Sequence, residues 1–208
     1  MKIRSIIFSS FILTFCFSLF ASEPAVLTLI KKKYNQNSTI QSQLDLNIYW
    51  SVREKSEQKS GTLVLAPQNC FKIELNGETF VSNGQLLWHY NKSIAQVTID
   101  KLSKVDVSSL PSNIFKTYLT QYSYTVKQKS DSEVILEWKK TAQDNSIYDS
   151  ITIWAVEKSG VVNKIQTVDR NGNINTYTFR NTIFGGKISG KVFDFQVPKN
   201  VQVLNNDE

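Results

Sequence analysis

The sequence predicts a mainly β protein with short helices, built on one continuous antiparallel sheet of about eleven strands. Most of the chain alternates apolar and polar residues with a period of two, which is the pattern of strands with one buried face. Asn-Gly, Ser-Gly and Gly-Gly pairs separate these runs and are typical of tight turns. Two stretches with a helical period interrupt the pattern, and no shift in composition marks a linker.

Residues 1–21 have the features of a secretory signal peptide. Two basic residues precede an apolar run at residues 6–20, and Ala21 offers a small residue for cleavage. The alternative is a retained membrane anchor, although the run is shorter than the roughly 20 residues that span a bilayer. We therefore expect residues 22–208 to form a single exported domain.

Composition and charge argue against several classes of function. The full chain has 24 basic and 18 acidic side chains, a formal net charge of +6. Loss of residues 1–21 would remove two basic residues and leave a charge of +4, spread over scattered lysines rather than clustered along a phosphate track. We therefore expect no nucleic-acid partner. One histidine and two cysteines are too few for a zinc site, so we also expect no metal and no cofactor.

The first element expected in the exported chain is a short amphipathic helix at residues 25–34. Val26, Leu29 and Ile30 recur there at helical spacing. A second helix is expected at residues 108–121, where the apolar residues again share one side.

Strands account for the rest of the exported chain. In the first of them Leu44, Leu46, Ile48 and Trp50 fall on one face, while polar residues fall on the other. The strands expected before the second helix are residues 40–53, 61–66, 71–75, 79–82, 85–90 and 95–99. Those expected after it centre on residues 122–126, 134–138, 151–155, 165–168, 177–179 and 193–197.

A sheet of this size has a consequence for function. About eleven strands twist and curl, and the resulting concavity is too wide for the side chains of the sheet to fill. The two helices can lie across it and bury the apolar side of the sheet. If they fill the concavity, the protein is a structural or interaction module; if they leave room, it carries an apolar ligand. The residue pattern leaves both possibilities open.

No arrangement of residues indicates an enzyme. Cys70 and His89 come nearest to a nucleophile and its base, but both fall within expected strands. Neither a helix N-terminus nor a third group is available to activate the thiol. The turn of serine hydrolases and the phosphate-binding loops are also missing. We therefore expect a protein without catalytic activity.

Four segments, taken in order, carry a resemblance to a known family. SNGQLLWHYNKSIAQVT (residues 82–98) has a D/N-G turn, a W-x-Y strand, an Asn and a Q-[AV] strand. GTLVLAPQNCFKIEL (61–75) is similar to a G-x-L-x-[VL]-x-[RK]-P-x-x-F pattern, LPSNIFKTYL (110–119) takes the place of an interrupting helix, and KVFDFQVPKNVQVLNND (191–207) is similar to an F-x-F-x-x-P-x-G-V-x-V-x-D ending. In order and spacing these segments resemble the outer-membrane lipoprotein carrier (LolA) family over about residues 24–207.

The resemblance implies a highly curved half-open barrel, covered by a helical lid, that works in the periplasm. Its implied function is that of a carrier, or chaperone, that shields the acyl chains of triacylated lipoproteins in a hydrophobic cavity. The implied partners are an inner-membrane lipoprotein-releasing ABC transporter and an outer-membrane lipoprotein receptor. We expect the carrier to be a monomer. The competing hypothesis is a lipid-independent periplasmic binding or assembly module on the same fold.

Two positions depart from the family pattern. Ala66 stands where the family usually has a basic residue before Pro67, and that residue is implicated in holding the lid closed. Asn200 stands where the family usually has Gly. We therefore expect the control of the lid to differ in this protein.

Alternation and the resemblance together select candidate site residues. Leu87 and Trp88 are neighbours in one strand, so only one of them can face a cavity. The candidate lining residues are Leu46, Ile48, Trp50, Leu65, Phe71, Leu87 and Trp88. The candidate lid residues are Leu110, Ile114, Phe115 and Leu119.

Overall fold

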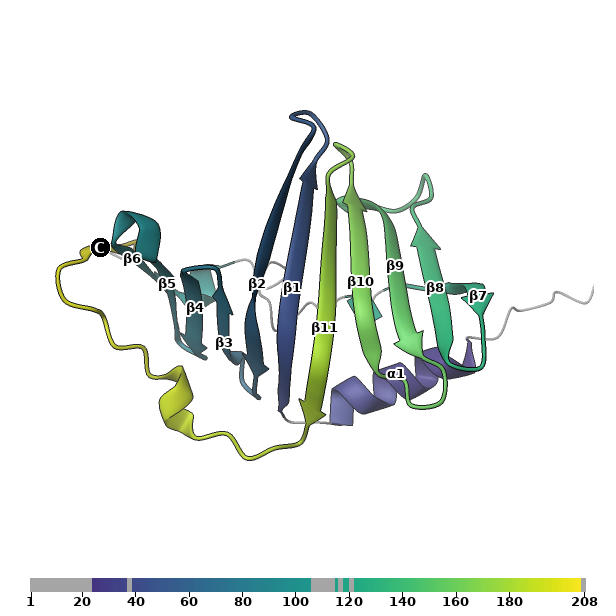
Figure 1. The fold of residues 1–208 in the computed structure, drawn as a ribbon, viewed down its shortest axis with the longest axis horizontal. Coiled ribbons are helices and arrows are strands. Elements are labelled where there is room, and N and C mark those ends of the chain that lie inside the picture. The colour runs from purple at the N-terminus through teal and green to yellow at the C-terminus, as the bar shows by residue number, and fades with distance from the viewer. Residues whose placement is uncertain (1–23, 37–38, 106–114, 116–117, 120–121, 207–208) are drawn as a thin grey trace, which may run out of the picture.

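The computed structural model describes residues 24–36, 39–105, 115, 118–119 and 122–206. These residues form one curved 12-stranded sheet, shown in Figure 1, with the order β12-β6-β5-β4-β3-β2-β1-β11-β10-β9-β8-β7. The strands are β1 (Ile40–Trp50), β2 (Lys55–Leu65), β3 (Cys70–Leu75), β4 (Glu78–Asn83), β5 (Leu86–Asn91), β6 (Gln96–Lys101), β7 (Thr125–Lys129), β8 (Glu133–Lys139), β9 (Tyr148–Val156), β10 (Val162–Asp169), β11 (Ile174–Phe184) and β12 (Gln202–Asn205). The predicted fold class is confirmed, with 12 strands in place of about eleven.

Two antiparallel meanders meet at the centre of this sheet. Strands β1 to β6 follow one another across one half, and β7 to β11 across the other. The first strand of the chain therefore pairs with β11, from Ile40 opposite Phe184 to Tyr49 opposite Ile174. Figure 1 shows the dark blue β1 beside the yellow-green β11. The centre of the sheet thus depends on contacts between the two ends of the domain.

The register of the strands places most of their buried apolar residues on one face, which we call the inner face. Ile40, Leu65 and Phe71 form one row across β1, β2 and β3. Where the two halves meet, Leu46 on β1 lies opposite Tyr177 on β11. The remaining buried sheet residues of this core are Leu44, Leu63, Ile73, Leu75, Val134, Leu136, Trp138, Ile151, Ile153, Ala155, Val162, Ile165 and Phe179.

Helix α1 (Ala25–Gln36) confirms the first predicted helix and runs along the lower ends of β8 to β11 in Figure 1. The helix packs closely against the turn between β9 and β10. A Cβ on Gly160 in that turn would lie only 2.9 Å from the backbone nitrogen of Ile30. The prediction that Leu29 belongs to the apolar stripe is wrong, since its side chain is 43% exposed. Leu27 is buried instead, because it shares a helix face with Ile30 and Tyr34 at spacings of three and seven residues.

The second predicted helix, at residues 108–121, lies mostly outside the described residues. Within it, Phe115, Tyr118 and Leu119 are described and are helical. Short 3-10 helices follow β5 at Lys92–Ile94 (η1) and β6 at Leu102–Lys104 (η2). Among the described residues, the helices fall short of the length and hydropathy needed to cross a membrane.

The prediction of a last strand at residues 193–197 is wrong. A 3-10 helix, η4 (Gly190–Phe193), occupies the start of residues 193–197, and the chain then runs without regular structure to β12. Strand β12 pairs with β6, and this pairing is parallel, unlike the other pairings in the sheet. The parallel direction follows from the long return of the chain, drawn in yellow in Figure 1, around the β6 edge.

The alternating aromatic residues of this return segment form a second core on the outer face of the sheet. Phe193 is buried, as are Val81 on β4 and Val97 on β6. The ring of Phe195 stacks on that of Trp88, with their centroids 6.2 Å apart. The period of two that predicted a strand therefore reflects Phe193, at the end of η4, and Phe195, in the irregular chain after it, whereas Val197 is exposed.

Gly61 is required where β2 begins to pair with β3. A Cβ at this position would lie 1.7 Å from the carbonyl oxygen of Glu74 on the neighbouring strand. The obstacle is backbone, which cannot turn aside as a flexible side chain can. A glycine in a strand often marks such a close approach of another backbone.

We predict that Gly61→Ala lowers the free energy of unfolding by at least about 2 kcal/mol, because the β2–β3 pairing must open to admit the methyl group. The matched control is Gly190→Ala, since nothing lies within 4 Å of a Cβ there, and its effect should stay within about 0.5 kcal/mol. Urea unfolding of the three proteins measures both values. Equal stability of the two variants would contradict the close approach.

Candidate functional site

The inner face of the sheet is the candidate site, and most of the predicted lining residues lie on it. Leu65 and Phe71 are buried within the core. Leu46 is partly buried and packs against the same core. Ile48 and Trp50 follow on the same face of β1, half-buried and 40% exposed respectively. The apolar surface therefore extends from the core towards the exposed end of β1.

Leu87 and Trp88 lie on opposite faces of β5. Leu87 packs against the inner core and pairs with Ser82 on β4. Trp88 faces the outer side, where it stacks on Phe195. The prediction of Trp88 as a lining residue is therefore corrected: its indole covers the second core, on the other side of the sheet from Leu87.

The predicted lid residues that the structure describes are both buried against the inner face. The ring of Phe115 stacks on Tyr34 of α1, with centroids 4.6 Å apart, and contacts Phe179 of β11 at 4.9 Å. Leu119 is 1% exposed. Leu110 and Ile114 lie outside the described residues. Phe115 and Leu119 thus belong to the same apolar core as the strands beneath them.

A group of tyrosines beside these residues was missed by the sequence analysis. The hydroxyl groups of Tyr118 and Tyr148 lie 2.6 Å apart and share a hydrogen bond. The hydroxyl of Tyr124 donates to the backbone carbonyl of Tyr118. Burial raises the pKa of both Tyr118 and Tyr124 well above the ordinary value of 10.0, and burial also raises the pKa of Tyr177 to about 12. These phenols therefore stay protonated and can donate hydrogen bonds.

Charged side chains lie at the side of the inner face formed by β2, β4 and β5. Lys59 contacts Glu57 at 3.2 Å and Glu78 at 3.3 Å. The ring of His89 stacks on Phe80 with centroids 4.1 Å apart, and its Nε2 is buried without a hydrogen-bond partner. Burial lowers the pKa of His89, although Glu78 opposes this shift. The inner face therefore has a polar margin in this half.

Cys70 and His89 do not form a catalytic pair. Cys70 precedes the inward-facing Phe71 in β3, so its thiol points to the outer face. His89 stacks on Phe80, which packs against the inner core. Burial also raises the pKa of Cys70 above 9.0, which disfavours the thiolate. The two groups are separated by the sheet itself.

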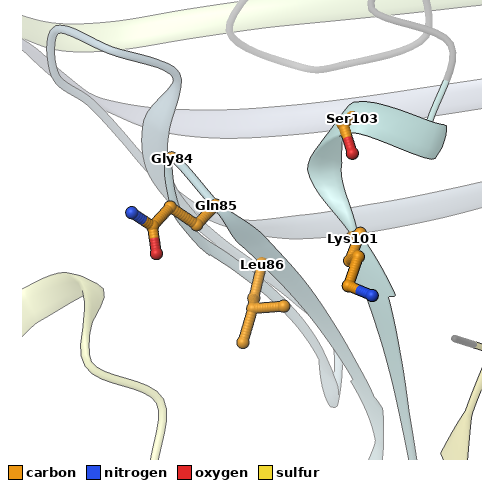
Figure 2. Close-up of a pocket in the computed structure, with 5 residues that line it drawn as sticks. All are labelled: Gly84, Gln85, Leu86, Lys101 and Ser103. Atoms are coloured by element: carbon orange, nitrogen blue, oxygen red, sulfur yellow. The ribbon is translucent and has the colours of Figure 1, made fainter.

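An open hollow lies at the turn between β4 and β5, away from the inner face. Figure 2 shows its lining residues, which are Gly84, Gln85, Leu86, Lys101 and Ser103. Its volume is about 450 Å³. Leu86 and Lys101 face one another across β5 and β6, on the face opposite to Leu87. The hollow has no carboxylate, and its walls offer little apolar surface that could shelter an acyl chain.

The sequence of the protein is similar to those of outer-membrane lipoprotein carrier proteins. The family model for outer membrane lipoprotein carrier protein LolA matches residues 49–196. An outer-membrane lipoprotein carrier protein of Haemophilus ducreyi is 31% identical over 142 residues, which are 65% of this chain and 63% of that protein, just under two thirds of its length. The protein of the same name from Actinobacillus pleuropneumoniae serotype 3 is 26% identical over 191 residues, which are 88% of this chain and 85% of that protein.

Among solved structures, an uncharacterized conserved protein from Thermus thermophilus superposes with a TM-score of 0.56. It is 11% identical, and the match covers 87% of this chain and 97% of that one, so the likeness concerns the fold alone. The family model, in contrast, matches more than half of the sequence. The chain therefore belongs to the LolA family of outer membrane lipoprotein carrier proteins.

Proposed function

We propose that this protein is a periplasmic carrier that shields the acyl chains of lipoproteins on the inner face of its sheet. The observation that supports this most directly is the continuity of that face. Apolar residues extend from the buried Phe71 and Leu65 along β1 to the partly buried Leu46 and the half-buried Ile48, where Lys59 and Glu57 of β2 form the polar margin. Family membership supports the same conclusion from the sequence side.

Acyl chains need such a carrier because water opposes their release from a membrane. At about 0.8 kcal/mol for each CH₂ group, exposing one sixteen-carbon chain to water costs on the order of 12 kcal/mol. A triacylated protein would therefore remain in its membrane. A carrier lowers this barrier by offering apolar contacts in place of those of the bilayer.

The contacts of the lid residues suggest how binding works. Phe115 and Leu119 contact the inner core through apolar groups, and an acyl chain can replace such contacts because they have no preferred direction. Binding then becomes an exchange, in which the chain covers the surface that Phe115 and Leu119 uncover. The cost of moving them weakens binding, so that a receptor can later withdraw the cargo.

The finer parts of this proposal follow the family. Residues 1–21 would be the signal peptide that directs export, leaving a monomeric domain at residues 22–208. The cargo would be triacylated lipoproteins, received from an inner-membrane lipoprotein-releasing ABC transporter and delivered to an outer-membrane lipoprotein receptor. Leu46, Ile48, Trp50, Leu65, Phe71 and Leu87 would line the cavity, with Phe115 and Leu119 in the lid.

We predict that the mature protein, purified from the periplasm without detergent, carries acyl chains or an acylated protein. Organic extraction followed by mass spectrometry measures them, and a periplasmic protein of similar size serves as control. A preparation that is free of lipid, and that also fails to bind a fluorescent sixteen-carbon fatty acid, would favour a lipid-independent binding module on the same fold.

We predict that Leu46→Asp weakens binding of the fluorescent fatty acid by about tenfold or more. The reason is that the variant puts a charge on the apolar face and removes a leucine worth about 1.5–3 kcal/mol of burial. Asn47→Asp is the matched control, because it introduces the same side chain at the adjacent, exposed position on the outer face. Fluorescence titration gives both dissociation constants. If the two variants bind the probe equally well, the inner face is not the binding surface.

A further inference from the structure

We propose that the hydroxyl pair of Tyr118 and Tyr148 is a latch that holds the lid residues against the sheet and sets the affinity for cargo. By lid residues we mean Phe115, Tyr118 and Leu119. The inference rests on the proposed function, because it assumes that acyl chains displace these residues. It assigns a positioning role to two side chains that the family resemblance did not single out.

The geometry joins the lid residues to a fixed strand. Tyr148 opens β9, a strand of the sheet that pairs with both β8 and β10. Its hydroxyl lies 2.6 Å from that of Tyr118, and the two rings meet edge to face with centroids 5.5 Å apart. Only 6% of Tyr118 is exposed. The bond is therefore a tertiary contact between residues 30 positions apart, largely sheltered from water.

A second hydrogen bond holds Tyr118 from its other side. The hydroxyl of Tyr124 donates to the backbone carbonyl of Tyr118, and Tyr124 is itself buried. The neighbouring Tyr122 packs on Trp138 of β8, with centroids 4.5 Å apart, and its hydroxyl lies 3.2 Å from Ser146 Oγ. The chain that follows the lid residues is thus tied to β8 and to the approach to β9.

The hydroxyl pair differs in kind from the contacts of Phe115 and Leu119. Phe115 and Leu119 touch apolar groups, and an arriving acyl chain can take over those contacts. The chain has no donor or acceptor along its length, so it cannot replace the bond to Tyr148. Displacement of Tyr118 in favour of an acyl chain leaves the Tyr148 hydroxyl against hydrocarbon, which is costly for a polar group. The pair therefore opposes opening more than the apolar contacts do.

The test compares Tyr118→Phe, Tyr148→Phe and the double variant with the unaltered mature protein. Each single change removes one oxygen and keeps the ring. We expect each to bind the fluorescent sixteen-carbon fatty acid about fivefold more tightly, which is the factor for one hydrogen bond of ordinary strength. The double variant should bind no more tightly than either single variant, because the two hydroxyls share one bond. Tyr90→Phe, on the outer face near Phe195, is the control and should leave the affinity unchanged.

Amide hydrogen exchange supplies a second readout that needs no ligand. Loss of the latch should speed exchange of the backbone around Tyr118 several-fold while leaving β10 and β11 protected. A gain in affinity together with faster local exchange supports the latch, whereas unchanged exchange and affinity in variants that still bind the probe overturn it. Weaker binding in both single variants also overturns it, because the pair would then help to form the binding surface. If no protein binds the probe, the proposed function fails, and exchange alone decides whether the two hydroxyls restrain the lid residues.

Discussion

The pairing of β1 with β11 is the interaction on which the rest of the structure depends. It joins two meanders that could otherwise form only local hairpins, and it aligns them so that Leu44 lies opposite Phe179 and Leu46 opposite Tyr177. Each half sheet alone would leave an unpaired central edge and half an apolar face. Joined, they present one inner face broad enough to take up α1, Phe115 and Leu119. The site is therefore a property of the whole sheet rather than of any motif.

The two faces of this sheet bury apolar residues in different ways. On the outer face, the return segment with Phe193 and Phe195 covers Trp88 and ends in β12, whose backbone pairs with β6. That cover is tied down by backbone hydrogen bonds and is structural. On the inner face, the described lid residues are held by apolar contacts and by the hydroxyls of Tyr148 and Tyr124, without pairing of backbone to backbone as in a sheet. Apolar side-chain contacts can be exchanged for a ligand more readily than backbone hydrogen bonds can, and this difference supports the inner face as the surface for the proposed carrier function.

The two departures from the family pattern now have a physical setting. Asn200 adopts a φ of 60°, a left-handed conformation that Asn tolerates better than most residues, so it can stand where the family usually has Gly. Ala66 lies at the β2–β3 turn, where its N–H donates to the carbonyl of Cys70, and its methyl group offers no hydrogen bond to a lid. Tyr148 lies four strands away, and the pairing registers place it towards the opposite ends of the strands. Control of the lid in this protein would thus rest on the other half of the sheet.

The sequence by itself determined the mainly β class, helix α1, the order of the first meander and the family, because period-two alternation, turn dipeptides and helical spacing are local patterns. It could not show that β2 starts at Lys55, since polar residues such as Lys55 and Gln58 hide the alternation. Nor could it tell the return segment from a strand, because Phe193 and Phe195 alternate with polar residues although Phe193 ends a 3-10 helix. Only the tertiary structure decided that Leu87 and not Trp88 faces inward, and that Tyr118 meets Tyr148. Those outcomes depend on which distant segment covers each face, and residue spacing along the chain carries no record of that choice.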